Sequence, residues 1–396
     1  MKQIKIYNGK ILTPLRCIEN GQIIIEGERI AYVGPGDASP GDFELINAGG
    51  NFVTPGFIDI HTHGGGGFDF MDGTEEAFFG AARAHALHGT TSMTPTTLAS
   101  TNEELERTFA VYEKVKNARH NGADFLGLHL EGPYFSMEMR GAQDPRYIRD
   151  PEPSEYQSIL SRSGDIVRWS AAPELPGAIA FGRTVRERGI LPSIAHTDAI
   201  YEQVLAAYEN GFTHVTHLYS AMSGVKRINA YRYAGAIESA FLIDDMTVEI
   251  IADGCHLPES LLRLIYKIKG PGRTALVTDS MRGAGMPEGE SIVGSIHNGQ
   301  KVIIEDGVAK MPDRSVFAGS VATADRLVRT MVKTAGVSIA DAVQMMTSTP
   351  AMIIGVDKDR GSLVAGKRAD IVIFDENINI KATIAGGRIV RKDGVA

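Results

Sequence analysis

Eight short apolar segments, most of them followed by a helix-like segment, dominate the central part of this chain. Repeated alternation of strand and helix predicts a parallel sheet, and eight repeats over about 300 residues favour a closed (β/α)₈ barrel over an open sheet. The predicted helices include Thr74–His88, Asn102–Asn117, Ala199–Glu209, Pro258–Lys267 and Ala322–Ala335. The eight predicted strands are Phe57–His63, Thr91–Thr96, Phe125–Glu131, Ile166–Ala172, Leu191–His196, Thr213–Leu218, Thr247–Asp253 and Thr274–Asp279.

Both ends of the chain differ from this central part. They contain short β-branched runs separated by turns with glycine or asparagine, such as Ile4–Tyr7, Gln22–Ile25 and Ile30–Val33 near one end and Ala369–Phe374 near the other. Such runs indicate strands, and chain termini often lie close in space. We therefore predict an α/β protein with a small β-sandwich domain from residues 1–53 plus 356–396 and a catalytic barrel from residues 54–355.

The composition is that of an ordinary globular protein, with 43% hydrophobic and 22% charged residues. A formal net charge of -8 gives no electrostatic argument for a nucleic-acid partner, although an acidic protein can contain a local basic pocket. The two cysteines, Cys17 and Cys255, imply no disulfide framework. No apolar run reaches the roughly 18 residues that a membrane helix needs. We predict a cytoplasmic protein without nucleic-acid or membrane partners.

The first predicted strand carries the most informative local pattern. Alternation along a strand places Asp59, His61 and His63 on one face. The glycine run Gly64–Gly67 follows, and its missing side chains allow a ligand or another backbone to come close. Taken alone, a His-x-His pair is equally compatible with two hydrogen-bonded structural histidines, so residues elsewhere must decide between the two interpretations.

Further imidazoles and carboxylates end other predicted strands, namely Glu131, His196, His217 and Asp279. The active site of a (β/α)₈ barrel lies at these carboxyl-terminal strand ends. Burying so many polar groups unpaired is costly, and a divalent metal satisfies them together. We expect alternation to place three pairs of residues on shared inward faces: His129 with Glu131, Val215 with His217, and Val277 with Asp279.

Each of these residues also has a structural interpretation. Glu131 and Asp279 are both suited to cap the turn that follows them, and His196 is suited to the core, held by Thr197 or Asp198. His214, three residues before His217, is expected to face the opposite side of its strand and to be structural. We favour Asp279 as the base, because a carboxylate beside a metal-bound water stays ionised and accepts that water's proton.

Seven motifs together resemble a known superfamily. Pro55–His63 and Gly366–Val372 resemble the amidohydrolase superfamily of metal-dependent hydrolases, and the other five are similar to motifs of the N-acetylglucosamine-6-phosphate deacetylases within it. The resemblance spans nearly the whole chain and implies a (β/α)₈ barrel with a small β-domain built from both chain ends. The five deacetylase-like motifs are His129–Pro133, Gly141–Gln143, Thr216–Met222, Ile251–His256 and Thr278–Arg282.

The resemblance implies a tightly bound metal on Glu131, His196 and His217, with Asp279 as the acid and base. Some members lack the two histidines after the first strand and use one metal, whereas this chain retains His61 and His63. We therefore predict one or two divalent ions per subunit. Zinc is our first choice, and iron, manganese and cobalt are alternatives, because imidazole and carboxylate ligands suit all of them.

The resemblance also implies residues that contact a phosphosugar. Members commonly place an arginine from the neighbouring subunit of a dimer on the sugar phosphate, and the basic cluster around Lys226 and Arg227 matches that position. We choose Arg227 over Arg232 and predict a homodimer; a solvated basic loop is the alternative. The other predicted substrate contacts are Ala142, Gln143, Ser220, Ala221, His256, Ala318 and Gly319.

Two departures from the family pattern affect recognition of the sugar rather than the metal. Gln143 stands where many members have histidine, and Ser220 replaces a usual asparagine. The predicted reaction is metal-dependent hydrolysis of the acetamide of N-acetyl-D-glucosamine 6-phosphate, giving D-glucosamine 6-phosphate and acetate in amino-sugar catabolism. The alternatives are the N-acetylgalactosamine 6-phosphate reaction, a non-catalytic phosphosugar-binding protein on the same barrel, and a phosphosugar isomerase that would need none of these histidines.

Overall fold

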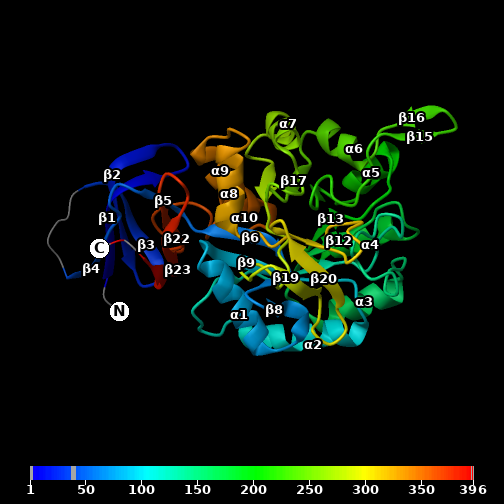
Figure 1. Ribbon diagram of the computed structural model, residues 1–396, viewed down its shortest axis with the longest axis horizontal. Coiled ribbons are helices and arrows are strands. Elements are labelled where there is room, and N and C mark those ends of the chain that lie inside the picture. The colour runs from blue at the N-terminus through cyan, green and yellow to red at the C-terminus, as the bar shows by residue number, and fades with distance from the viewer. Residues whose placement is uncertain (1–2, 37–41, 394, 396) are drawn as a thin grey trace.

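The computed structural model describes residues 3–36, 42–393 and 395, and its centre is a ring of parallel strands surrounded by helices (Figure 1). Neighbouring strands pair in the order in which they follow one another along the chain. The third strand position is divided between two short strands, β10 and β11. The ring contains β6 (Phe57–Thr62), β9 (Thr90–Thr97), β10 (Asp124–Phe125), β11 (Leu128–Glu131), β12 (Ile166–Ala171), β13 (Leu191–Ile194), β14 (His214–Val215), β17 (Thr247–Ile250) and β18 (Thr274–Leu276).

The ring closes between its first and last strands. The backbone N–H of Asp279 donates to the carbonyl of His61 at 2.9 Å, and the N–H of His63 donates to the carbonyl of Ser280 at 2.8 Å. Both bonds join the carboxyl end of β6 to the residues that follow β18. The predicted (β/α)₈ barrel is thus confirmed, and its closure brings the first and eighth strand ends side by side.

The helices pack around the barrel through one hydrophobic core. In α2, for example, the side chain of Thr101 caps the first turn by accepting from the N–H of Glu104, and the buried face includes Leu105, Phe109 and Tyr112. Five helices were predicted: α1 (Glu75–Ala86), α2 (Asn102–Val115), α5 (Tyr201–Glu209), α7 (Glu259–Lys269) and α8 (Ala324–Lys333). The others are α3 (Pro153–Arg162), α4 (Ala178–Glu187), α6 (Ala236–Leu242), α9 (Ile339–Met346), α10 (Ser348–Ile353) and the 3₁₀ turn η1 (Phe70–Asp72).

Strands from both chain ends form a second sheet beside the barrel, at the left of Figure 1. It has its own hydrophobic core, which includes Ile6, Ile23, Val53 and Ile373. The predicted small β-domain from both chain ends is confirmed, whereas the proposed limits at residues 53 and 356 stay a prediction. The sheet consists of β1 (Gln3–Leu12), β2 (Cys17–Glu26), β3 (Arg29–Pro35), β4 (Phe43–Asn47), β5 (Phe52–Pro55), β22 (Ile371–Phe374), β23 (Ile380–Ala385) and β24 (Arg388–Lys392).

Three small antiparallel units lie in the loops at the carboxyl end of the barrel, and none of them was predicted. The hairpin of β15 (Lys226–Ile228) and β16 (Tyr231–Tyr233) projects away from the barrel (Figure 1). A three-stranded sheet joins β19 (Gly289–Val293), β20 (Gln300–Glu305) and β21 (Val308–Lys310), and a short ladder joins β7 (Gly64–Gly65) to β8 (Phe68–Asp69). Among the described helices, none is long and apolar enough to cross a membrane.

Candidate metal centre

Two groups of buried ligand-type residues lie at the carboxyl end of the barrel. In the first group, Glu131, His196 and His217 offer three ligand atoms that lie within 4.8 Å of one another. The Nε2 atom of His217 is 3.0 Å from Oε1 of Glu131 and 3.2 Å from Nε2 of His196. The sequence predicted these three residues as the ligands of one metal, and the fold brings them together.

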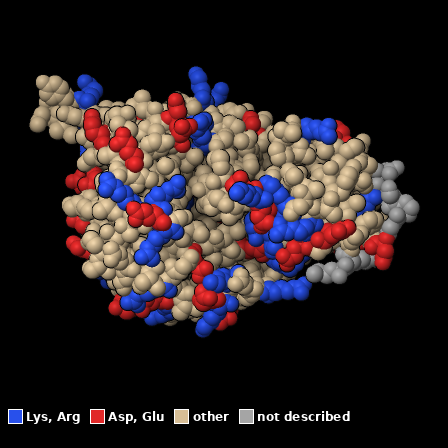
Figure 2. All heavy atoms as spheres, turned by 180° about the vertical axis from the view of Figure 1, so that it is seen from behind, with Lys and Arg blue, Asp and Glu red and all other residues tan. Residues whose placement is uncertain are grey.

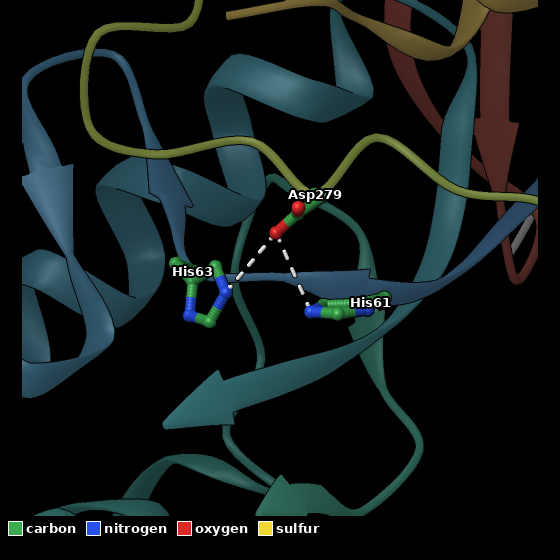
Figure 3. Close-up of side chains that lie close together, drawn as sticks. All are labelled: His61, His63 and Asp279. Atoms are coloured by element: carbon green, nitrogen blue, oxygen red, sulfur yellow. Dashed lines mark ion pairs between the residues drawn. The ribbon is translucent and has the colours of Figure 1, made fainter. Parts of the chain in front are cut away.

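The second group contains His61, His63 and Asp279 (Figure 3). Both histidines come from the end of β6, and Asp279 comes from the loop after β18 and points toward them. One carboxylate oxygen, Oδ1, is 3.2 Å from Nε2 of His63 and 3.4 Å from Nε2 of His61. The closure of the barrel therefore also assembles this group.

Glu131 connects the two groups. Its Oε1 lies 3.4 Å from Nε2 of His61, and its Oε2 lies 3.4 Å from Nε2 of His63. Nε2 of His61 is buried and has no hydrogen-bond partner among the described residues. Imidazole nitrogens and carboxylate oxygens that converge in this way are the donor set of zinc and related divalent ions, so the residues fit a site for one or two metals.

Negative charge governs the electrostatics of this centre. Burial lowers the pKa of His63, but hydrogen bonds to Asp279 and Glu131 and the charges of these carboxylates raise it to about 10. Burial raises the pKa of Glu131, yet the nearby His61 and the hydrogen bonds from histidines bring it well below its usual range. The pKa of Asp279 is lowered for similar reasons. Carboxylates that hold a proton so strongly on a neighbouring imidazole will also attract a cation.

Three of the ligand-type residues lie two or three residues beyond a strand end, whereas His63 directly follows β6. The strands β13, β14 and β18 end two or three residues earlier than His196, His217 and Asp279, whose φ values are 45°, 30° and 46°. Such backbone conformations interrupt the alternation of side chains, because they depart from the extended region. The expected shared inward faces are wrong for two pairs: Val215 and Val277 lie in hydrophobic clusters, apart from His217 and Asp279.

The expectation for His214 also needs correction. Its Nε2 lies 3.2 Å from Oε2 of Glu249, and the N–H of His217 donates to Oε1 of the same carboxylate at 3.3 Å. His214 and His217 therefore both lie inside the barrel, although His214 does lie outside the two ligand groups, as predicted. The reason is again that β14 ends at Val215, before the chain reaches His217.

A cavity of about 450 Å³ opens onto both ligand groups. Its walls include His63, Glu131, His196, His217 and Asp279, so a bound molecule would contact the centre directly. Seven of the eight predicted substrate contacts also line this cavity, namely Ala142, Gln143, Ser220, Ala221, His256, Ala318 and Gly319. The fold thus brings together residues from distant parts of the sequence, and their roles toward a substrate remain predictions.

Two of these lining residues have a contact that the sequence did not reveal. The side-chain amide of Gln143 donates to Oε2 of Glu131 at 2.7 Å, while its Oε1 accepts from the N–H of Ala99 at 2.9 Å. Gln143 therefore orients the carboxylate of Glu131, a candidate metal ligand. Gly319 has φ +69°, and a Cβ at this position would lie 3.0 Å from the carbonyl oxygen of Asp279, so glycine allows the two segments to approach closely.

Residues beneath the centre form a polar layer that sequence reasoning largely missed. His129, predicted to share an inward face with Glu131, packs its ring edgewise against His61 at 4.7 Å between centroids. Arg168 and Glu249 are fully buried and form an ion pair at 2.5 Å. Burial raises the pKa of Glu249, but Arg168 and the neighbouring histidines lower it well below its usual range. The sequence signal for Arg168 and Glu249 was a single charged residue within an otherwise uncharged strand.

The remaining predicted contact, Arg227, lies apart from the cavity. It is exposed on the projecting hairpin, which the second view also shows standing out from the barrel (Figure 2), and it pairs directly with Arg232 on the opposite strand. Val225, Ile228 and Tyr231 of the same segment are exposed as well. Within the described part of this chain, the cavity is therefore lined without Arg227.

Comparison with known proteins shows the family. The amidohydrolase family model matches residues 52–390, which is most of the chain. The chain belongs to the amidohydrolase family. This family is metal-dependent, and the two buried groups are able to bind a metal. The superfamily inferred from the sequence motifs is thereby confirmed.

Individual members of the family resemble the chain over nearly its full length. It is 32% identical to the N-acetylglucosamine-6-phosphate deacetylase of Haemophilus influenzae over 97% of this chain and 98% of that protein. It is 29% identical to an N-acetylgalactosamine-6-phosphate deacetylase of Escherichia coli O157:H7, with 96% and 97% coverage. A solved mutant of the Mycobacterium smegmatis N-acetyl-D-glucosamine-6-phosphate deacetylase, in complex with N-acetyl-D-glucosamine-6-phosphate, matches with a TM-score of 0.90, 30% identity and coverage of 99% and 100%.

Proposed function

We propose that this amidohydrolase removes the acetyl group of N-acetyl-D-glucosamine 6-phosphate, giving D-glucosamine 6-phosphate and acetate. The observation that carries the proposal is the carboxylate of Asp279 on the wall of a cavity that also contains the Glu131, His196 and His217 group. This arrangement places a base, Asp279, beside a candidate metal site. The names of the relatives supply the phosphosugar and the amide.

The proposed mechanism assigns the proton transfers to Asp279. Glu131, His196 and His217 would hold a divalent ion, which would supply polarisation of the amide carbonyl and would lower the pKa of a water. Asp279 is ionised at neutral pH, because its pKa lies below its ordinary value, and it accepts the proton of the attacking water. It then donates that proton to the nitrogen of the leaving amine as the C–N bond breaks.

We assign recognition of the phosphate to Arg227 and His256. Arg227 and Arg232 lie directly opposite each other on the hairpin, and like charges in that arrangement repel unless an anion lies between or near them. The hairpin projects with exposed Ile228 and Tyr231, which suits insertion into a second copy of the chain. A homodimer that places Arg227 at its partner's cavity follows from this assignment.

Several finer features of this proposal come from the sequence. Zinc is the proposed metal, because a compact group of histidine and carboxylate ligands is typical of zinc sites. Two ions per subunit are proposed, since His61 and His63 accompany the first group. A cytoplasmic location and the absence of nucleic-acid partners remain predictions; Figure 2 shows basic and acidic side chains intermingled over one face of the molecule.

The hydrolysis of the galacto epimer is the second candidate, favoured by the relative named for that reaction. The test measures acetate release by metal-quantified protein with N-acetylglucosamine 6-phosphate, N-acetylgalactosamine 6-phosphate and unphosphorylated N-acetylglucosamine side by side. We expect the first to be hydrolysed fastest and the third to be a poor substrate. If the metal-loaded protein releases acetate from none of them, the proposal is refuted. That result is the one expected of a non-catalytic phosphosugar-binding protein.

Arg227→Ala and Arg232→Ala form a matched pair for the phosphate assignment. Losing a hydrogen bond to a charged group costs about 1.5–3 kcal/mol, so Arg227→Ala should raise KM for the phosphosugar about 10-fold to 100-fold with a smaller effect on kcat. Arg232→Ala should change KM less. If Arg232→Ala raises KM more than Arg227→Ala does, Arg232 is the residue that contacts the phosphate. If both variants have the same rates as the parent protein, the hairpin takes no part in binding the phosphate.

A further inference from the structure

The buried carboxylate of Glu249 lies at the centre of a polar network directly behind the second ligand group. Its Oε1 accepts from Nδ1 of His61 at 2.7 Å and from the N–H of His217 at 3.3 Å. Its Oε2 accepts from Nη1 of Arg168 at 2.5 Å and lies 3.2 Å from Nε2 of His214. From the seventh strand position, β17, this one carboxylate thus contacts residues from the first, fourth and sixth strand positions of the barrel.

This contact decides which nitrogen of His61 is free. A neutral imidazole carries one proton, and the short hydrogen bond places that proton on Nδ1, facing Glu249. Nε2 is then left with its lone pair directed at the space between Asp279 and Glu131, at 3.4 Å from each carboxylate. A carboxylate behind a histidine is the usual device that orients an imidazole and raises its basicity toward a metal.

Arg168 keeps this carboxylate charged and fixed. It is fully buried, and it also donates to Oγ of Ser193 at 3.0 Å, to Oγ1 of Thr216 at 2.7 Å and to the carbonyl of Ile60 at 3.3 Å. An unpaired carboxylate at this depth would be costly, whereas a fully hydrogen-bonded ion pair is tolerated and rigid. The guanidinium therefore holds Glu249 against His61.

The other imidazoles of the centre are supported differently. Nδ1 of His196 lies 2.9 Å from the carbonyl of Met139. Nδ1 of His63 and of His217 are buried without a hydrogen-bond partner among the described residues. Of the four histidines, His61 is thus the one backed by a charged group, and it belongs to the group that combines β6 with Asp279.

We propose that Glu249, held by Arg168, is the positioning residue that makes the His61, His63 and Asp279 group a second metal site. Glu249 does not itself contact the metal or the substrate; it acts through the tautomer and orientation of His61. The inference rests on the proposed metal ligands and not on the proposed sugar. A protein that binds metal but hydrolyses no amino sugar would leave it standing.

The test measures binding of Zn²⁺ to the purified full chain. Metal content is determined after purification, and the affinity of each site is measured by competition with a chromophoric chelator. We expect the parent protein to bind two ions. Glu249→Gln should bind the second ion about 10-fold to 100-fold more weakly, because an amide must turn its NH₂ toward either Arg168 or His61. The loss at the first site should be smaller, since Glu249 meets that group only through the backbone N–H of His217 at 3.3 Å.

A matched control and a second variant keep the result interpretable. Asp370, another buried carboxylate, pairs with Arg360 at 2.8 Å beside the amino-terminal end of the barrel. Asp370→Asn should lose stability and keep both ions at unchanged affinity. If Glu249→Gln does not fold, the double variant Glu249→Leu/Arg168→Leu removes both charges together and should also bind one ion tightly and the second weakly.

Three results would overturn the proposal. One is a parent protein that binds a single ion, since His61 would then be oriented toward no second site. Another is a Glu249→Gln protein, or the double variant in its place, that binds both ions as the parent does. The third is an equal weakening of both sites, which would make Glu249 a residue of general structural importance.

Discussion

The two ligand groups lie side by side, but they are built differently. His61 lies near the end of a regular strand, β6, and His63 follows directly after its last residue, so that alternation places both on the same face. His196 and His217 follow the ends of β13 and β14 and have positive φ values of 45° and 30°. Strand geometry therefore places the side chains of one group, whereas the conformation of loop backbone places those of the other.

This difference shows two ways in which a barrel can direct ligand side chains toward one point. A non-glycine residue with positive φ costs roughly 1–3 kcal/mol and persists where the surrounding structure enforces it. At His217 the surroundings include the carboxylate of Glu249, which accepts its N–H, and Glu131, which meets its Nε2. The loop-borne ligands can point inward because strain at the strand ends is offset by such contacts.

The largest effect is expected at Asp279, which belongs to one group and lines the cavity of both. Asp279→Asn removes the base and leaves Glu131, His196 and His217 intact, so kcat should fall about 1000-fold while one metal and the substrate are still bound. Steady-state kinetics with metal analysis checks this. Retention of most of the turnover would exclude Asp279 from the proton transfers.

A matched pair of substitutions compares the groups directly. His196→Ala removes a ligand of the first group and should lower kcat/KM at least about 100-fold, the size typical of losing electrostatic stabilisation at a reacting centre. His63→Ala removes a ligand of the second group and should lower it about 10-fold, because one metal remains. The reverse order would mean that the strand-borne group holds the essential ion.

A smaller effect is expected from the residue that orients Glu131. Gln143→Leu removes the hydrogen bond to Oε2 of Glu131 and leaves the N–H of Ala99 without its acceptor. Loss of such an orienting bond typically weakens metal binding 10-fold or more, and we expect about 10-fold here. Chelator competition measures this, and Gln143→His, the residue that the family resemblance implies at this position, serves as the comparison. Unchanged affinity in both variants would leave Gln143 with a role in sugar recognition alone.

The smallest effect concerns stability and the glycine loop that follows His63. His85 is buried, its Nε2 lies 2.8 Å from the carbonyl of Gly64, and burial lowers its pKa to about 4. In the unfolded chain this histidine has an ordinary pKa of about 6.5, so it is protonated at a higher pH than in the folded protein. As the pH falls from about 6.5 to 4, the free energy of unfolding therefore decreases. From pH 7 to 5 the loss should be about 2 kcal/mol from this residue.

His85→Gln tests that dependence, because glutamine can still donate to Gly64 but does not titrate in this range. Urea unfolding at pH 7 and pH 5 should show a smaller decrease for the variant than for the parent protein. Equal decreases would place the acid sensitivity elsewhere, for example at His214, whose pKa is also lowered to about 4 by burial.

Much of the architecture was predictable because periodicity is a local property. Eight apolar segments and their helices indicated the barrel, and the β-branched runs at both ends indicated the second sheet. The helices α3, α4, α6, α9 and α10 were not among the five examples given from the sequence, and helices in contact with a barrel owe their stability to packing as much as to their own sequence. The hairpin of β15 and β16 was missed for a related reason: it has few residues and little buried surface.

The sequence by itself determined which residue types end the strands, and thus that His61, His63, Glu131, His196, His217 and Asp279 were candidates for one centre. Only the tertiary structure decided how they converge. Barrel closure joins β6 to the segment after β18, positive φ turns His196 and His217 inward, and the Arg168–Glu249 pair beneath them fixes His61. These are contacts between residues far apart in the chain, and local periodicity carries no information about them.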